Sequence, residues 1–438
     1  MNILVIGNGF DLAHGLPTKY TDFLLFCKAI INIIEKSRVE KLIPKNDDDF
    51  KNWIERSDKI PLVDIKELNK NLCDESDNTN NEDWQKYKNI YYDFLFKCLY
   101  NENSNHKLVK ESFYLIYNNF WINYFLHCDM HGKENWIDFE SEISKVIKSF
   151  DRDMHDRPNE IDLYDEIEIQ FSNDFLDTYE RFDCCETYKE IRNILENDLN
   201  ALIRAFEIYL TEYVEKIKIQ KKSPDIDGLE IDFILSFNYT HIFSKLYDVS
   251  NLSKKEITDP FDYIHGEADT NNSIETNNMV LGIDEYLGKK RRNKDIEFIA
   301  FKKYYQRIHK QTGCKYKDWS DIIKKNEREL KEKYKKEYPN QVPFKQCGDK
   351  RHRLYIFGHS LDITDKDILR NLILNDNVYT TIFYHNKDVM GQQIANLVKV
   401  IGQDELIRRT GGTTKTIEFK QQQDMVSIKK GKTPIQTI

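Results

Sequence analysis

Short runs of β-branched and aromatic residues, the pattern of buried strands, are divided between the two ends of the chain. The first run is NILVIG at residues 2–7, and the others begin only beyond residue 230. They lie at 232–237, 262–266, 279–283, 353–358 and 380–385, with one further candidate at 414–419. Because these runs are apolar on both faces and helix-like stretches separate them, they predict a mostly parallel sheet covered on both sides. The expected fold class is therefore α/β, with a sheet whose strands are split in sequence.

The block that separates the first strand from the rest has the pattern of helices. Glycine is scarce in the whole chain, 16 in 438 residues, and only Gly132 occurs between Gly15 and Gly228. Leu, Ile, Phe, Tyr, Lys and Glu fill this block at helical spacing. We therefore expect a large helical insertion at 20–226. The core would be discontinuous and built from 1–19, 227–285 and 351–438.

A second insertion is expected at 286–350, and it is strongly basic. From Tyr286 to Tyr338 it contains 18 Lys and Arg against 8 Asp and Glu, in a chain with a net charge of −9. Its segments KKRRNK (289–294) and FKKYYQRIHK (301–310) combine cations with aromatic rings, as nucleic-acid-binding surfaces do. Solvated helix faces have the same composition. Nucleic-acid contact and an ordinary charged helix therefore both stay open for this insertion.

The composition indicates a folded protein of the cytoplasm. Hydrophobic residues make up 40% of the chain, which supplies a core, but the most apolar run, 23–34, is too short for a bilayer and contains Lys28. No positively charged leader precedes the apolar residues 3–6. The eight cysteines form no Cys-x-x-Cys pair, so we expect reduced thiols and no metal site. No membrane contact is expected.

The turn after the first strand is the first candidate ligand site. Gly7, Asn8 and Gly9 lead from the strand into a helix-like segment, and such a turn presents backbone N–H groups to a phosphate. Leu12 stands where the dinucleotide fingerprint has its third glycine, so a tight turn without a ligand also explains the pattern. A second turn at 15–17, Gly-Leu-Pro, would form another wall of the same site.

The string GNGFDLAHGLPTKYTDFL, with a later SFNYT, an HG pair, LGID and GHSLDITDKDIL, resembles the AbiH family of bacteriophage abortive-infection proteins. More distantly, the same order of pieces is similar to the sirtuin-like Rossmann fold that binds NAD. The Gly-x-Gly and Gly-Ile-Pro turns of that fold align without gaps on residues 7–9 and 15–17. The resemblance implies a sirtuin-like Rossmann core, NAD as the substrate, and an antiphage role set off by a phage-derived trigger.

The resemblance places two catalytic residues after strands of the sheet. Asn238 follows the run at 232–237 and matches the catalytic Asn of sirtuin-like proteins, and His265, before Gly266, matches their general base. Taken alone, Asn238 also suits a helix cap or a turn, and His265 a satisfied buried histidine. The implied nucleotide-binding residues are Gly7, Asn8, Gly9, Phe10, Asp11, Gly15, Leu16, Pro17, Asp284, Gly358, His359 and Ser360.

Other acidic residues have open interpretations. Asp362, Asp365 and Asp367 are predicted to cap the helix after GHSL, where negative charge suits the helix dipole. Asp11 could bind ribose hydroxyls or cap the first helix. The motif WIDFESE, residues 136–142, has two interpretations. It is either a core Trp beside a solvated acidic helix face, or it supplies a carboxylate that faces the site.

Cleavage of the ribose–nicotinamide bond suits these residue types. The cationic ring leaves as a neutral molecule, so no general acid is required and the paired carboxylates of ordinary glycosidases are not needed. The sequence departs from sirtuins at Phe237, Tyr239 and Thr240 and at residues 18–20, where their usual nicotinamide contact is absent. A nucleotide other than NAD therefore also fits, and protein deacetylation is not expected.

The sequence thus predicts an antiphage effector that hydrolyses NAD or a related nucleotide at the N-glycosidic bond. The alternative is a nucleic-acid-binding abortive-infection protein whose glycine loop senses a nucleotide without hydrolysing it. A homo-oligomer is compatible with either prediction.

Overall fold

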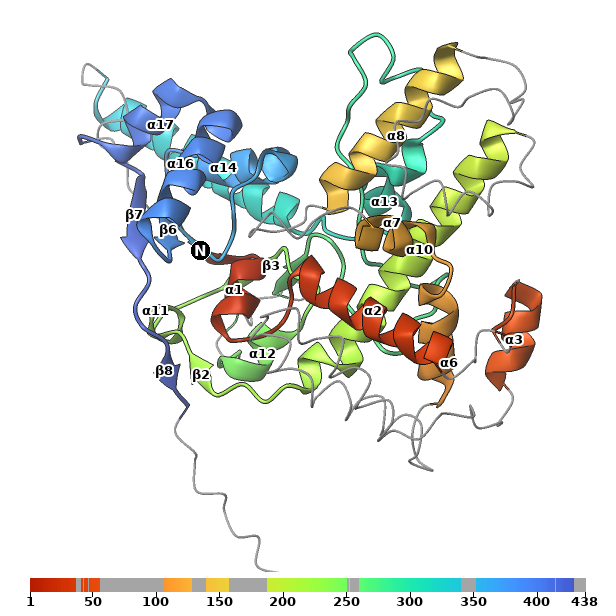
Figure 1. Ribbon diagram of the computed structural model, residues 1–438. Coiled ribbons are helices and arrows are strands. Elements are labelled where there is room, and N and C mark those ends of the chain that lie inside the picture. Colours follow the sequence, from red (N-terminus) through yellow and green to blue (C-terminus); the bar gives the residue numbers. More distant parts are fainter. Residues whose placement is uncertain are drawn as a thin grey trace, which may run out of the picture. The chain divides into compact units, whose positions relative to one another are not determined.

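The computed structural model describes residues 1–36, 41, 43–45, 47–55, 106–127, 139–156, 187–249, 252, 260–339, 352–413 and 415–428. The chain divides into two compact units, each assembled from segments that are distant in sequence (Figure 1). The first unit consists of Met1–Pro17, Ile217–Glu267 and Gln311–Ile438, and the second of Thr18–Lys216 and Ala268–Lys310.

The first unit contains a six-stranded sheet in which every pairing is parallel. Its strands, in chain order, are β1 (Asn2–Ile6), β3 (Phe233–Ser236), β4 (Phe261–Tyr263), β5 (His352–Phe357), β6 (Val378–Tyr384) and β7 (Ile417–Gln421). The spatial order is β4-β3-β1-β5-β6-β7, which is 3-2-1-4-5-6 when the strands of this sheet are counted along the chain. The first strand therefore lies in the interior of the sheet, and the predicted α/β class with a mostly parallel sheet is confirmed.

One predicted strand is wrong. Residues 279–283 belong to the second unit and make only an isolated bridge, between Ile283 and Lys302. The side chain of Gln306, on α13 (Lys303–His309), accepts from the Leu281 N–H and donates to the Leu281 carbonyl, both at 3.0 Å. A side-chain amide thus satisfies backbone groups that a neighbouring strand would otherwise pair, and β-branched composition alone could not reveal this.

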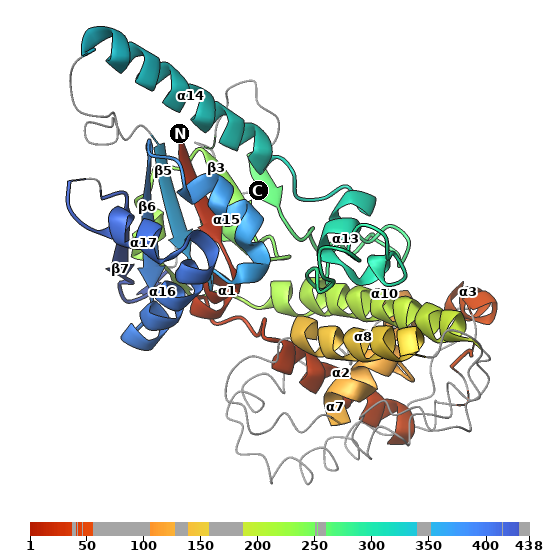
Figure 2. The same cartoon turned by 90° about the horizontal axis from the view of Figure 1, so that it is seen from above.

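Both faces of the sheet are covered, as strands that are apolar on both sides require. On one face, Ile3, Val5 and Ile356 belong to a core that helices of the same unit complete (Figure 2). The side chain of Phe357, the residue after Ile356 in β5, points to the opposite face of the sheet, and its ring centroid lies 6.2 Å from that of Phe10. The helices of the first face are α14 (Tyr316–Glu337), α15 (Lys366–Ile373), α16 (Lys387–Ile401) and α17 (Gln403–Thr410), and those of the second are α1 (Asn8–Ala13) and α12 (Ile242–Leu246).

Short elements complete the first unit. The strands β2 (Lys221–Lys222) and β8 (Val426–Ser427) pair antiparallel to each other. The helical turns are α11 (Pro224–Asp227) and the 3-10 turn η6 (Ile363–Asp365), which leads directly into α15.

All regular secondary structure described between residues 20 and 216 is helical, in agreement with the glycine-poor pattern. The longest helix that the structure describes, α10 (Tyr188–Glu212), begins at a capping box in which Thr187 and Glu190 satisfy each other's backbone N–H groups. Aromatic side chains join it to α2, since Phe23 lies 5.0 Å from Phe206 between ring centroids. The helices of the second unit are α2 (Tyr20–Lys36), α3 (Asp47–Glu55), α6 (His106–Ile116), α7 (Phe120–His127), α8 (Phe139–Asp156), α10 (Tyr188–Glu212) and α13, with 3-10 turns η3 (Val214–Lys216) and η4 (Ile299–Phe301). Among the helices that the structure describes, none has the length and apolar character needed to cross a bilayer.

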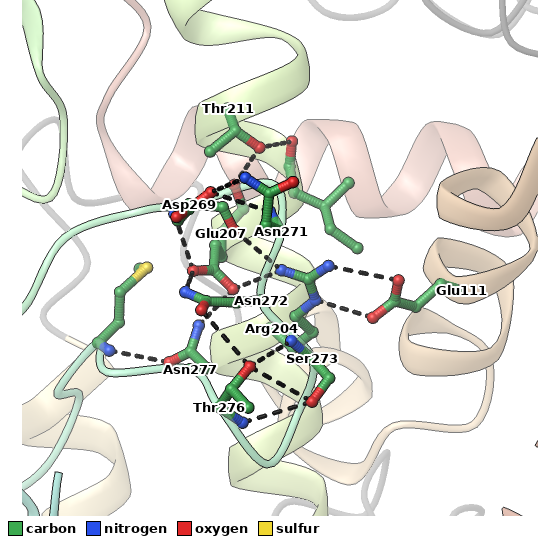
Figure 3. A network of polar contacts seen from close by, with 12 residues as sticks. Glu111, Arg204, Glu207, Thr211, Asp269, Asn271, Asn272, Ser273, Thr276 and Asn277 are labelled. Carbon is green, nitrogen blue, oxygen red and sulfur yellow. Dashed lines mark hydrogen bonds and ion pairs between the residues drawn. The ribbon is translucent and has the colours of Figure 1, made fainter. Parts of the chain in front are cut away.

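A buried network of charges fixes the segment 269–277 to α10 (Figure 3). Arg204 is 1% exposed and donates to Glu111 at 2.8 Å and to Glu207 at 2.6 Å. Glu207 also accepts from the Asp269 N–H and from the side chains of two asparagines, Asn272 and Asn277. Because the guanidinium and both carboxylates are paired and hydrogen-bonded, this network satisfies the condition under which buried charges are tolerated.

Candidate functional site

Glycine turns and polar side chains from three distant parts of the chain gather where strands of the parallel sheet end. Gly7 follows β1, Asn238 lies two residues after β3, and His265 lies two residues after β4. Gly358 and His359 directly follow β5. Because β1, β3, β4 and β5 are parallel neighbours, their carboxyl ends meet at one edge of the sheet, where open α/β folds bind ligands. All of these residues belong to the first unit.

The turns after β1 and β5 pack against each other backbone to backbone. A Cβ atom added at Gly7 or at Gly9 would lie 2.8 Å from backbone atoms of Gly358. Gly358 itself has a positive φ of 68°, and a Cβ there would lie 2.1 Å from the Phe10 nitrogen. Glycine is therefore required at these three positions for contact between the turns.

Backbone carbonyls of the two turns engage three N–H groups of the first turn. Gly7 donates to the Phe357 carbonyl at 3.2 Å, Gly9 to the Gly358 carbonyl at 2.8 Å, and Phe10 to the Gly7 carbonyl at 2.8 Å. These are N–H groups that a glycine-rich turn would otherwise present to a phosphate. A ligand at this edge would therefore be recognised mainly by side chains.

Asn238 is held rigidly through its backbone while its side chain stays unsatisfied. Its N–H donates to Ser236 Oγ at 3.1 Å, and that hydroxyl donates back to the Asn238 carbonyl at 3.0 Å. The residue is 4% exposed, and within the described part of the chain neither Oδ1 nor Nδ2 of its carboxamide has a hydrogen-bond partner. Leaving a buried polar group unpaired costs about 1–3 kcal/mol, so such a group points to a missing partner. A capping role is wrong, because His241 holds the N-cap position of α12.

His265 and His359 share the carboxylate of Asp365. His265 Nε2 lies 3.5 Å from Asp365 Oδ1, and His359 Nε2 lies 3.4 Å from Asp365 Oδ2. All three residues are buried. The ring of Phe237 lies against both imidazoles, with centroid separations of 5.5 Å from His265 and 4.2 Å from His359. The fold thus joins the predicted base to a second histidine and a carboxylate.

The three aspartates of the GHSLDITDKD segment have different roles. Asp362 accepts from the Thr364 N–H at 3.0 Å and caps η6, and Asp367 lies in the first turn of α15. Asp365 occupies the N-cap position of α15 but makes no side-chain capping bond, so its predicted capping role is wrong. Its side chain turns toward the histidines instead. Sequence reasoning missed this residue because the capping pattern explained it, although two histidines at strand ends were a signal.

Asp11 and His14 fasten α1 to the loop and helix that follow β3. Asp11 is buried, and Thr240 Oγ1 donates to its carboxylate at 2.7 Å. Gly7 is the N-cap of α1, so Asp11 does not cap this helix. His14 contacts the Phe10 carbonyl through Nδ1 at 2.7 Å and the Tyr247 hydroxyl through Nε2 at 2.9 Å. Burial lowers the pKa of His14, against the opposing effect of its bond to the Phe10 carbonyl. Both side chains therefore hold this edge together.

The remaining predicted residues after β1 lie at the end of α1 or inside the core. The Phe10 side chain is fully buried among aromatic rings, so only its backbone could meet a ligand. Gly15 has a φ of 78°, and its N–H donates to the Leu12 carbonyl at 3.0 Å. Leu16 donates to the Asp11 carbonyl at 3.1 Å, and both Leu16 and Pro17 are buried. These contacts end α1.

The loop after β5 is held from α16. Gln393 Nε2 donates to the His359 carbonyl at 3.1 Å, and Asn396 Nδ2 donates to the Ser360 carbonyl at 2.9 Å. Ser360 is exposed beside the buried His359. Asp284 belongs to the second unit, where it is exposed. The structure therefore gathers the turns, Asn238, His265 and the 358–360 loop in one unit and leaves Asp284 in the other.

Three cations of the basic segment 301–310 are used inside the second unit. Lys302 pairs with Glu285 at 3.0 Å, Lys303 pairs with Glu140 at 2.7 Å, and Lys310 donates to the Met279 carbonyl at 2.5 Å. The predicted nucleic-acid contact of the insertion stays a prediction, and these three side chains would not carry it. Of the WIDFESE motif, Trp136 to Asp138 lie outside the described residues.

The fold and this edge place the chain among α/β proteins whose candidate site lies at the carboxyl ends of parallel strands. A family model for bacteriophage abortive infection proteins, AbiH, matches residues 3–120 and 91–385. These matches span most of the chain, from β1 to the end of β6, and the chain belongs to the AbiH family. A search of the curated proteins and a search of the solved structures each gave no match. Family membership indicates a part in abortive infection, the defence of bacteria against phage.

Proposed function

We propose that this chain is an antiphage abortive-infection effector that hydrolyses NAD or a related nucleotide at the N-glycosidic bond. Family membership supports the biological role. The observation that carries the chemistry is the Asn238 carboxamide, buried at the carboxyl edge of the sheet with no hydrogen-bond partner among the described residues. A ribose hydroxyl and the attacking water offer the donor and acceptor that such an amide lacks.

The sheet topology supports a nucleotide as the substrate class. The order 3-2-1-4-5-6 is that of dinucleotide-binding Rossmann folds, in which the ligand lies where the order reverses. In this chain the reversal falls between β1 and β5, where the glycine turns meet. The proposal therefore includes a sirtuin-like Rossmann core. Because backbone N–H groups of the first turn are engaged, we expect side chains such as Asn8 and the exposed Ser360 to contact the phosphates or the ribose.

The proposed reaction is a displacement at ribose C1′. The C1′–N bond breaks, and its electron pair leaves with nicotinamide, which becomes neutral. Water forms the new C1′–O bond and gives a proton to the His265 imidazole. Asn238 orients the ribose and the water by hydrogen bonds that its buried position keeps rigid.

The test is nicotinamide release from NAD by the purified protein, followed by chromatography. We expect Asn238→Ala to lower the rate by about 10²-fold or more, because it removes a rigidly placed polar group from the reacting centre. Asn271→Ala is the matched control, since this asparagine is exposed in the second unit, and its rate should equal that of the wild type.

Because a phage-derived trigger is part of the proposal, cellular NAD is followed after infection in the same variants. A fall in NAD with the wild type and its absence with Asn238→Ala would support the proposal. The proposal fails if NAD and the other cellular nucleotides persist while the wild-type protein still blocks the phage. Salt-dependent binding of DNA or RNA in that case would favour the nucleic-acid-binding alternative.

A further inference from the structure

We propose that Asp365 is a positioning residue: it holds the proton of His265 on Nε2, so that Nδ1 of His265 is the atom that takes the proton from water. The catalytic consequence rests on the function proposed above, whereas the tautomer of His265 does not. The inference follows from the arrangement of two imidazoles around one buried carboxylate.

The tautomer of His359 is fixed by the backbone. The Leu361 N–H donates to His359 Nδ1 at 2.9 Å, so this nitrogen carries a lone pair and the ring proton lies on Nε2. His359 Nε2 is the atom that lies 3.4 Å from Asp365 Oδ2. One oxygen of the carboxylate therefore faces an N–H whose position is already decided.

The loop that carries His359 has a strained conformation. Leu361 has a positive φ of 60°, which is uncommon for any residue other than glycine and unfavourable for one with a large side chain. Its side chain is nevertheless fully buried in the core, and the two amides of α16 hold the carbonyls of His359 and Ser360. Such strain persists only where the surroundings over-determine it, and it is frequent at functional sites. Here it directs His359 toward Asp365.

The two histidines therefore differ in what they can do with a second proton. Protonation of His359 at Nδ1 would set this nitrogen against the Leu361 N–H, because both groups would then be donors. His265 has no such constraint from Leu361, and its Nε2 faces the other oxygen of Asp365 at 3.5 Å. A proton that arrives from water goes to His265 Nδ1, and the carboxylate stabilises the imidazolium that forms. His359 keeps Nδ1 as an acceptor for the Leu361 N–H and holds the carboxylate in place through Nε2.

The first experiment reads tautomers rather than activity. In protein with ¹⁵N-labelled histidine, ring nitrogen shifts distinguish Nδ1–H from Nε2–H, and His265→Gln and His359→Gln assign the two signals. We expect both rings of the wild type to be Nε2–H when neutral. In Asp365→Asn the new amide offers a donor to His265, so we expect its Nδ1–H form to increase while His359 stays Nε2–H.

Asp362→Asn is the matched control from the same loop. Asp362 accepts from the Thr364 N–H and caps η6, whereas Asp365 is the residue that faces the histidines. Asparagine caps a helix as well as aspartate does. We expect both rings to keep the wild-type tautomers in this variant. The proposal is overturned if the neutral His265 ring of the wild type is Nδ1–H. It is also overturned if Asp365→Asn leaves the tautomer of His265 unchanged. The wild-type measurement does not depend on the stability of the variant.

The second experiment measures nucleotide hydrolysis. We expect Asp365→Asn to lower kcat by about 10²-fold or more with little change in KM, because the base is misoriented while substrate contacts persist. An unchanged kcat would contradict the positioning role. If the tautomers behave as expected and the wild type hydrolyses no nucleotide, Asp365 still positions His265 and the proposed function alone fails.

Discussion

Individual buried polar groups in this protein fall into two kinds. Glu207 and Arg204 are almost fully buried, and each makes several charge-assisted hydrogen bonds. Asn238 is equally enclosed, and its carboxamide makes none with the described residues. The first kind stabilises a local arrangement, whereas the second costs free energy unless something else binds. This difference is why we place the candidate chemistry at Asn238 and regard the Arg204 network as structural.

Lys310 gives a pH-dependent prediction at the residue scale. Burial lowers the pKa of Lys310 to about 8, and the nearby Glu207 opposes the shift. In the unfolded chain the pKa of a lysine is about 10.4. Below pH 8 the ammonium is charged in both states, and the folded protein carries its desolvation cost. As the pH rises from about 8 to about 10, Lys310 loses its proton in the folded state before the unfolded state does, and the desolvation cost disappears.

We therefore expect the free energy of unfolding of the wild type to rise relative to that of Lys310→Met between about pH 8 and pH 10. Allowing for solvent screening, the relative change should be about 1–3 kcal/mol. Denaturant unfolding at several pH values measures it. The control is Lys289→Met, at an exposed position of the same unit. Its free energy of unfolding should differ from that of the wild type by the same amount at every pH. A difference that falls as the pH rises would contradict the argument.

At the scale of elements, the turns after β1 and β5 act as one structure. Glycines at 7, 9 and 358 let the two backbones touch, and hydrogen bonds from Gly7 and Gly9 join them. This contact brings the start of α1 beside the loop that carries His359. The glycine pattern of the sequence therefore has a structural reason in addition to any contact with a ligand.

We expect Gly358→Ala to destabilise the protein by about 2 kcal/mol or more, because a Cβ there meets Phe10 and Gly9 and the φ of 68° disfavours alanine. The control is Gly391→Ala on α16, where nothing lies within 4 Å of the added Cβ. Alanine at this exposed position should stabilise the helix by about 0.5–1 kcal/mol. Denaturant unfolding compares the two variants. Equal effects would show that the turns do not touch as described.

At the scale of the whole molecule, the first unit depends on residues from both ends of the chain. β1 pairs on one side with β3 and on the other with β5, so the N-terminal segment supplies an interior strand. The second unit is likewise built from two separate segments. Neither unit corresponds to a continuous piece of chain, so neither could be produced as one continuous fragment.

Deletion of residues 1–17 should therefore abolish cooperative unfolding of the first unit, because β3 and β5 lose their common partner. Truncation after residue 413 removes β8, the partner of β2, together with β7, which lies at the edge of the sheet and pairs with β6 alone among the described strands. We expect that variant to keep a cooperative transition at a lower denaturant concentration. Amide hydrogen exchange of β5 is measured in both variants. Protected β5 amides in the variant that lacks residues 1–17 would refute the prediction.

The sequence by itself determined the local patterns. Apolar β-branched runs identified the six strands of the sheet, glycine scarcity identified the helical block, and motifs along the chain identified the family. These features depend on neighbouring residues, so they can be read from the chain directly. The sequence also placed Asn238 and His265 after strands, and a parallel sheet then brings such positions to one edge.

Only the tertiary structure decided how distant groups satisfy one another. Residues 279–283 have strand composition, yet Gln306 takes the hydrogen bonds of Leu281. Asp365 fits a helix cap, yet it faces two histidines that lie on loops after different strands. The N–H groups of the first turn suit a phosphate, yet the turn after β5 engages Gly9. In each case the competing partner is far away along the chain, and the direction of a side chain depends on which partner folding brings within reach.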